Sequence, residues 1–277
     1  MWSDDERSWR PCLRLIGLAL LASTLAGCGS QRDTPTSVAA RSAATTETTT
    51  VTVSAPPDQI GISGSANVPA HREMIGRSVR GRPIFARRNG DANAKRRILV
   101  VGCIHGDERA GVAVTRHLRQ ATPPAGVALW LVDSFNPDGC AAGTRLNANE
   151  VDLNRNSPQD WSTQTGDFPP GPHPLSEPES QAINRFVLRM QPAISIWYHQ
   201  QAGLVDDSGG DPVIEREYAR RVGLPFVHYG DKPGSITSWQ NATFPDSTAF
   251  VVELLAGPLS QSAIRRHADA VLSLAAR

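Results

Sequence analysis

The sequence has almost no excess charge of either sign. Lysine and arginine number 28, aspartate and glutamate number 27, and the formal net charge is +1. We therefore expect no nucleic-acid partner, since such proteins usually carry a clear basic excess. The 277 residues are 40% hydrophobic and 20% charged, with no internal repeat. This composition excludes fibrous and globally disordered proteins.

The apolar run near the N-terminus is too short for a comfortable transmembrane helix, which needs about 20 residues. It follows three arginines, reads LIGLALLASTLAG and ends at Cys28. A charged segment, a short apolar segment and small residues are typical of a secretory signal, and LAGC resembles the lipobox of bacterial lipoproteins. We therefore predict that residues 1–28 are a lipoprotein signal peptide. An ordinary cleaved signal, with Cys28 unmodified, is the alternative.

Either alternative places the mature protein outside the cytoplasm, in the cell envelope. With lipid on Cys28, the membrane would be a partner only through this anchor. Residues 29–67 are rich in Ser, Thr and Ala. They cannot bury enough apolar surface to offset the entropy of ordering, which predicts a disordered tether. Residues 68–277 remain, which is near the size of one domain.

Cysteine is scarce, with four residues in the whole chain. Cys12 lies in the predicted signal and Cys28 would carry lipid, so the folded part retains Cys103 and Cys140. An oxidising compartment permits a disulfide between them. Two unpaired buried thiols are equally compatible with the sequence, because spacing alone does not reveal their geometry.

The folded part alternates strand patterns with helix patterns. Short β-branched and apolar runs bounded by turn residues predict interior strands at 96–103, 126–134, 192–200 and 247–255. Helical patterns occupy 108–120, 176–192 and 259–277. This alternation predicts an α/β fold, a three-layer α/β/α sandwich around a mixed, largely parallel sheet.

The segment 176–192 has the clearest helical pattern. Ser176 and Glu179 have the spacing of a capping box at its start. Four apolar residues fall on one face of the predicted helix, namely Ile183, Phe186, Val187 and Met190.

Polar residues that could bind a metal follow two of the predicted strands. His105 and Glu108 come just after the first strand, and His199 lies at the end of the third. Ligands of such sheets gather at the carboxyl ends of the strands. Two imidazoles and one carboxylate form a known set for catalytic zinc, with a fourth position open. A polar turn without metal is the alternative, because isolated H-x-x-E pairs occur by chance.

Glu253 lies inside the apolar run AFVVELLAG. An ionised carboxylate there would be costly without a partner, and such a group suits a general base. The alternative is an edge-strand glutamate that points to solvent by simple alternation.

The segment 145–156, RLNANEVDLNRN, is dense in arginine and asparagine. Arginine can bind a carboxylate through two parallel hydrogen bonds and can stabilise an oxyanion. A polar surface loop is the alternative.

Several motifs together resemble the M14 zinc carboxypeptidase family. They are IGRSVRGRPI (75–84), HGDE (105–108), NPDG (136–139), DLNRN (152–156), His199 and Glu253, in the family's order and approximate spacing. Within the family the chain looks most like the murein peptide amidases, because of NANEVDLNRN, SEPESQAI and KPGSITSW.

The resemblance implies that His105, Glu108 and His199 hold one zinc ion. It also implies that Asp152 accepts a hydrogen bond from the His105 imidazole, as carboxylates behind metal ligands do.

Further roles follow from the same resemblance. Glu253 would be the general base and proton shuttle, and Arg145 would polarise the scissile carbonyl. Asn154 and Arg155 would anchor the substrate carboxylate. After the GSI turn the chain has residues 239–241, WQN, where a tyrosine lid is expected, so we predict no phenol lid.

The leading functional prediction is a zinc amidase that cuts peptidoglycan stem peptides, between γ-linked D-glutamate and a diamino acid such as meso-diaminopimelate. One alternative is a general metallocarboxypeptidase acting on L-peptides. Another is an inactive wall-binding lipoprotein. His173 and His228 lack a second ligand at suitable spacing, and we expect both to be ordinary loop residues.

Overall fold

The computed structural model describes residues 71–230 and 232–277. The predicted signal peptide, Cys28 and the predicted tether lie outside the described residues. The strands are β1 (His71–Arg77), β2 (Pro83–Gly90), β3 (Arg96–Val101), β4 (Val127–Val132), β5 (Ile194–Asp206), β6 (Phe226–Val227) and β7 (Thr248–Leu255). The helices are α1 (Gly111–Leu118), α2 (Pro137–Ala142), α3 (Pro178–Met190), α4 (Pro212–Val222), α5 (Ile236–Thr243) and α6 (Gln261–Ala275), with a 3-10 turn η1 (Leu153–Arg155).

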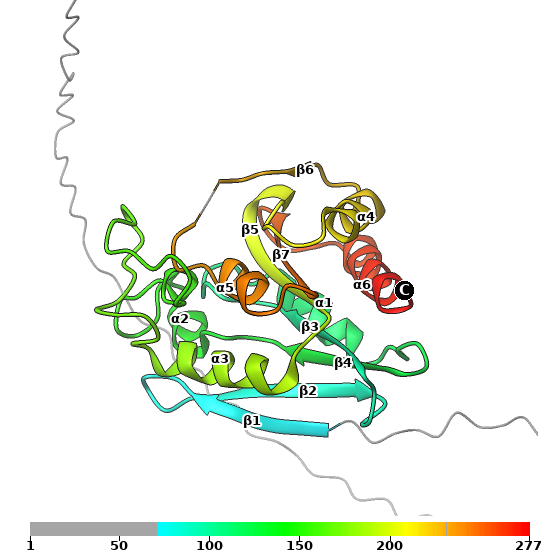
Figure 1. Cartoon of the computed structure of the whole chain (residues 1–277), viewed down its shortest axis with the longest axis horizontal. Coiled ribbons are helices and arrows are strands. Elements are labelled where there is room, and N and C mark those ends of the chain that lie inside the picture. Colours follow the sequence, from blue (N-terminus) through cyan, green and yellow to red (C-terminus); the bar gives the residue numbers. More distant parts are fainter. Residues whose placement is uncertain (1–70, 231) are drawn as a thin grey trace, which may run out of the picture. The chain divides into compact units, whose positions relative to one another are not determined.

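One mixed sheet forms the centre of the fold (Figure 1). Its strand order is β1-β2-β4-β3-β5-β6, and β7 also pairs with β5. The β1–β2 and β2–β4 pairs are antiparallel, whereas β3 with β4, β3 with β5, β5 with β6 and β5 with β7 are parallel. The prediction of a mixed, largely parallel sheet is confirmed.

Helices cover both faces of this sheet (Figure 1). Ile98 and Val100 of β3 pack with apolar residues of α1, α4 and α6. Leu99 and Val101 point the other way and pack with residues of α3 and α5, as the two-residue period of a strand requires. The fold is therefore the predicted three-layer α/β/α sandwich. None of the helices in the described residues has the length and hydrophobicity of a membrane span.

The start of α3 differs from the prediction. Glu177 is the N-cap, and no side chain caps the helix, so the predicted capping box is wrong. Ser176 Oγ donates to Glu177 Oε1 at 2.8 Å, while Glu179 Oε1 accepts from the Val79 N–H at 3.0 Å. Ser176 Oγ also accepts from Asn156 Nδ2 at 2.9 Å, so other partners engage both groups that were expected to cap the helix. The predicted apolar face is buried as expected, with Ile183, Phe186, Val187 and Met190 in the core.

Glu215, in the first turn of α4, is fully buried. Burial raises the pKa of its carboxyl to about 8, and the nearby charge of Asp207 adds to this. The folded chain therefore keeps a proton that the unfolded chain releases above about pH 4.5. Because the folded state binds more protons, stability falls as the pH rises from about 4.5 to 8.

A Glu215→Gln variant should therefore be more stable than the unaltered chain at neutral pH. The free energy of unfolding should rise by about 3 kcal/mol at pH 7 and change little at pH 4.5. Urea unfolding at both pH values measures this difference. The exposed Asp269→Asn on α6 is the control, and an equal gain at both pH values would contradict the assignment.

Candidate metal centre and active site

His105 and Glu108 lie on the turn between β3 and α1. The Glu108 N–H donates to the His105 carbonyl at 3.0 Å and closes this turn. Between them, the Gly106 backbone lies so close to α2 that an added Cβ would be 1.9 Å from the Gly139 carbonyl carbon. A side chain at position 106 does not fit. This close approach holds both side chains at the carboxyl end of β3.

His199 and Glu253 come from the neighbouring strands β5 and β7. The parallel register pairs these two residues directly, so their side chains project from the same face of the sheet. Glu253 is only 9% exposed, and its Oε2 accepts from the Ala202 N–H at 3.4 Å. The alternative of a solvent-directed glutamate is therefore wrong.

The three predicted metal ligands converge. His105 Nδ1 is 2.9 Å from Glu108 Oε1, and His199 Nδ1 is 2.9 Å from Glu108 Oε2. The two Nδ1 atoms are 3.2 Å apart, and one ligand atom from each residue lies within 4.8 Å of the others. All three side chains are buried. Two imidazole nitrogens and a carboxylate that face one point suit a divalent cation such as zinc.

Asp152 orients the His105 ring from behind. It lies at the N-cap of η1, is fully buried, and its Oδ1 is 3.0 Å from His105 Nε2. When Nε2 donates this hydrogen bond, the lone pair is left on Nδ1, which faces Glu108. Asp152 is therefore placed to fix the tautomer of His105, as the resemblance implied.

Both carboxylates of this cluster stay ionised. Burial by itself would raise the pKa of Asp152, but the hydrogen bond with His105 and the charge of Arg145 outweigh it and lower that pKa below its ordinary range. Burial also opposes ionisation of Glu108, yet the hydrogen bonds with His105 and His199 lower its pKa in the same way. Each carboxylate is therefore available as an anion at neutral pH.

His105 and His199 line a cavity of about 310 Å³, which we call the catalytic cavity. The remaining predicted residues lie around it. Arg145 Nη1 donates to Glu108 Oε1 at 2.8 Å, and its Nε donates to Asp152 Oδ2 at 3.0 Å. Asn154 Oδ1 accepts from the Ile236 N–H at 3.1 Å. Arg155 and Glu253 complete the predicted set. Residues far apart in the sequence therefore form one site.

Comparison with known proteins agrees with this geometry. The sequence profile of the family described as zinc carboxypeptidase matches residues 68–206. The chain belongs to this family. Murein peptide amidase A of Escherichia coli strain K12 is 32% identical over 187 residues, 62% of this chain and 76% of the relative. The protein of the same name from Vibrio campbellii is 29% identical over 216 residues, 72% of this chain and 85% of the relative.

Solved structures of zinc carboxypeptidases have the same fold. Murein-tripeptide amidase MpaA from Escherichia coli O157 superimposes with a TM-score of 0.61 at 28% identity, covering 77% of this chain and 94% of that one. Carboxypeptidase A from Helicoverpa armigera gives 0.64 at 18% identity, covering 76% and 69%. The predicted resemblance is confirmed, and the chain is a hydrolytic enzyme.

Six residues that line the catalytic cavity were not predicted from the sequence, namely Phe168, Gln200, Gln201, Tyr229, Lys232 and Val251. Tyr229 stands before the GSI turn, whereas the expected tyrosine position lies after it. The prediction of no phenol lid at residues 239–241 stays a prediction. The Tyr229 N–H donates to Asp206 Oδ1 at 2.7 Å. A tyrosine five residues before Gly234 was the available signal.

The ring of Phe168 packs against the guanidinium groups of Arg145 and Arg155. The guanidinium carbons of Arg145 and Arg155 are 4.7 Å and 5.1 Å from its ring centre. Both distances fall within the range of cation–π attraction. This ring comes from the Pro-rich loop between η1 and α3, so this loop contributes to the wall of the cavity.

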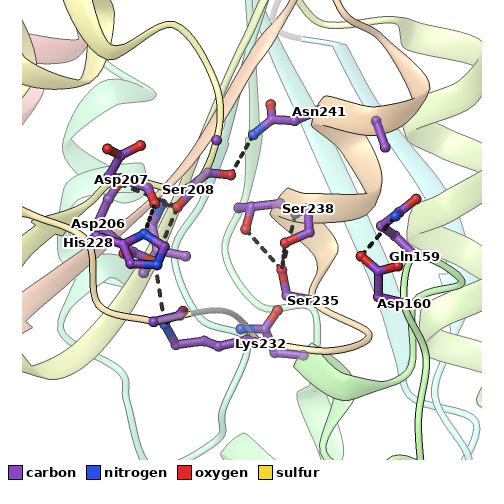
Figure 2. Close-up of a pocket in the computed structure, with 16 residues that line it drawn as sticks. Gln159, Asp160, Asp206, Asp207, Ser208, His228, Lys232, Ser235, Ser238 and Asn241 are labelled. Atoms are coloured by element: carbon purple, nitrogen blue, oxygen red, sulfur yellow. Dashed lines mark hydrogen bonds and ion pairs between the residues drawn. The ribbon is translucent and has the colours of Figure 1, made fainter.

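A second cavity of about 450 Å³ adjoins the catalytic cavity, and the two share Asn154, Lys232 and Val251. We call it the side pocket (Figure 2). Most of its lining is polar, including Asp206, Asp207, Ser208, His228, Ser235, Ser238 and Asn241. His228 was expected to be an ordinary loop residue, yet it forms part of this wall. His173 is an exposed loop residue, as predicted.

Proposed function

We propose that this zinc carboxypeptidase hydrolyses an amide bond in peptidoglycan stem peptides, between γ-linked D-glutamate and meso-diaminopimelate. The side pocket carries the proposal. The side chain of diaminopimelate ends in an ammonium and a carboxylate, and each needs a polar partner when it is buried. The pocket offers both signs of charge, on Asp207 and Lys232.

Asp206 and Asp207 of the side pocket differ in the contacts that they already make. Asp206 accepts from the Tyr229 N–H and lies 3.5 Å from Lys232 Nζ. Asp207 makes no ion pair with any residue that the structure describes, and it lies on the pocket wall beside His228 (Figure 2). We assign the substrate ammonium to Asp207 and the substrate side-chain carboxylate to Lys232. The names of the murein peptide amidase relatives support the same substrate class.

One zinc ion would be held by His105, Glu108 and His199. Their convergent Nδ1 and carboxylate atoms fit this ion, and the matching family is described as zinc carboxypeptidase. Zinc would act as a Lewis acid towards the amide carbonyl and would lower the pKa of water to about 7.

Glu253 and Arg145 would supply the proton transfer and the oxyanion contact. The Glu253 carboxylate accepts a proton from the attacking water and then donates it to the leaving nitrogen. Its register position opposite His199 keeps it beside the ligand set. Arg145, whose Nη1 already contacts Glu108, donates to the oxygen on which negative charge develops.

Asn154 and Arg155 would bind the main-chain carboxylate of the leaving residue. Arg155 is 7% exposed and lines the catalytic cavity, where its guanidinium can make paired hydrogen bonds. Asn154 Oδ1 accepts from the Ile236 N–H, so the side-chain Nδ2 is the group that would donate to the substrate carboxylate. Together they would position the leaving residue, with its main chain in the catalytic cavity and its side chain directed into the side pocket.

We also propose that the enzyme works outside the cytoplasm, tied to the membrane by lipid on Cys28. The apolar run that ends in LAGC supports this. A flexible tether over residues 29–67 would let the 68–277 domain reach nearby wall material. Its substrate would then be a peptide or a peptidoglycan fragment.

A peptide assay on the zinc-loaded full chain tests the proposed substrate. L-Ala-γ-D-Glu-meso-diaminopimelate should be cleaved, and the matching L-lysine tripeptide should have a kcat/KM about 10- to 100-fold lower. Asp207→Asn should lower kcat/KM for the diaminopimelate peptide by a similar factor. Asp160→Asn is the matched control, because Asp160 also lines the side pocket but accepts a hydrogen bond from Gln159.

The alternatives give different results in this assay. Release of ordinary C-terminal residues from L-peptides, without cleavage of the tripeptide, would indicate a general metallocarboxypeptidase. Failure to hydrolyse either substrate would indicate an inactive wall-binding protein. Both outcomes contradict the proposed function.

A further inference from the structure

Two thiols meet directly behind the metal-ligand turn. Cys103 follows β3, two residues before His105, and Cys140 lies in α2. Their Sγ atoms are 2.9 Å apart. Cys103 Sγ donates to the His105 carbonyl at 3.0 Å, and Cys140 Sγ lies 3.1 Å from Ser134 Oγ. Neither thiol has a role in the proposed hydrolysis.

Backbone contacts already hold the segment that contains Cys103 next to the segment that contains Cys140. The Phe135 N–H donates to the Cys103 carbonyl at 2.9 Å. On the other side, Gly106 is in close contact with Gly139 and Cys140. Since a disulfide forms only where the two cysteine side chains face each other at short range, these contacts meet the main geometric requirement without a large backbone movement.

We propose that Cys103 and Cys140 form a disulfide that covalently ties the turn carrying His105 and Glu108 to α2. The bond would hold the backbone of the turn that carries two metal ligands. This effect does not depend on which substrate the enzyme cleaves. It closes a segment with a sequence separation of 37 residues. Its effect would be to restrict separation of the metal-ligand turn from α2 when the chain unfolds.

The bond would form by exchange with a small-molecule disulfide such as oxidised glutathione. Cys103 is fully buried, whereas Cys140 is partly exposed, so Cys140 is the entry point. The Cys140 thiolate attacks the reagent and releases one glutathione thiolate. Cys103 then loses its proton and attacks Cys140 Sγ, which releases the second. Two protein thiols and one glutathione disulfide thus give one protein disulfide and two glutathione thiols.

One further observation supports Cys140 as the attacking group. The hydrogen bond with Cys103 lowers the pKa of Cys140 below its ordinary value, against the opposing effect of burial. A lower pKa favours the thiolate, which is the form that attacks disulfides.

Peptide mapping of the full chain tests the bond. The reduced protein is freed of reductant, treated with oxidised glutathione, alkylated, and digested with trypsin without reductant. We expect peptide 98–109, ILVVGCIHGDER, linked to peptide 120–145, at a mass two hydrogen atoms below the sum of the free peptides. Recovery of the two peptides as separate alkylated thiols, or of Cys140 as a glutathione adduct, would overturn the proposal.

Thermal unfolding gives a second readout. The oxidised chain should melt about 10 °C above the chain kept in reductant. Cys103→Ser combined with Cys140→Ser should remove this difference, while Cys12→Ser combined with Cys28→Ser should preserve it. An equal Tm with and without reductant would contradict a bond that ties the folded chain.

Discussion

A Glu253→Gln variant is expected to hydrolyse the peptide amide with a kcat about 1,000-fold lower than that of the unaltered enzyme. Glutamine keeps the size of the side chain and its place opposite His199 on β7, but it cannot accept a proton from water. The loss should appear in kcat more than in KM, because Glu253 would contribute to the transition state rather than to substrate binding.

Two controls separate this effect from damage to the fold. Glu253 lies outside the group of converging ligands, so the variant should bind one zinc per chain and keep its Tm. The exposed Asp246→Asn should leave kcat unchanged. If Glu253→Gln retained full turnover, another group would have to be the base.

Removal of the metal should have the second large effect. Dialysis against a chelator should reduce hydrolysis to background, and one equivalent of zinc should restore it. The Tm should also fall, because an ion that binds only the folded state stabilises it by mass action. Activity and metal content measured on the same samples test this expectation.

A pair of histidine variants locates the metal. His199→Ala removes one of the three convergent ligands and should leave a chain that does not regain activity with stoichiometric zinc. His228→Ala removes an imidazole from the side pocket and should keep full zinc content. Equal zinc content in the two variants would place the metal elsewhere.

The interior of the sheet could be predicted because its strands are continuous apolar runs. β3 and β4 are covered on both faces, so every residue of β4 is buried, and such runs stand out in a sequence. The edge strands were harder to predict. β1 is an edge strand, and its residues are exposed or half-buried, so it lacks a continuous apolar run. Its neighbour β2 carries Arg87 and Arg88, which also interrupt the apolar pattern.

Helix α4 had local signals that were not used. Asp211 caps it, Pro212 is at its first position, and Gly223 ends it in a left-handed conformation, which together mark a helix. By contrast, Glu179 of α3 accepts hydrogen bonds from Val79 and Asn147 and does not cap the helix. Local spacing carries no information about such partners.

The candidate site was predicted well where residues follow strands and poorly where they lie on loops. His105 follows β3, as predicted. His199 was expected at the end of a strand, but it lies inside β5, which continues to Asp206 because β7 pairs with it beyond this point. The family resemblance added the roles of Asp152 and Arg145. Tyr229 and the side pocket depend instead on tertiary contacts, such as that between Tyr229 and Asp206. No periodicity in the sequence encodes the position of these irregular segments.

The pairing of His199 with Glu253 in the register of β5 and β7 has a consequence for substrate preference. Adjacent strands keep a spacing of about 4.8 Å whatever their loops contain, so the reacting groups are insulated from changes elsewhere. The groups assigned to the substrate side chain, Asp207 and Lys232, come from the variable connections beyond this frame. Substitutions in these connections would therefore change the preference for the leaving residue without moving His199 or Glu253.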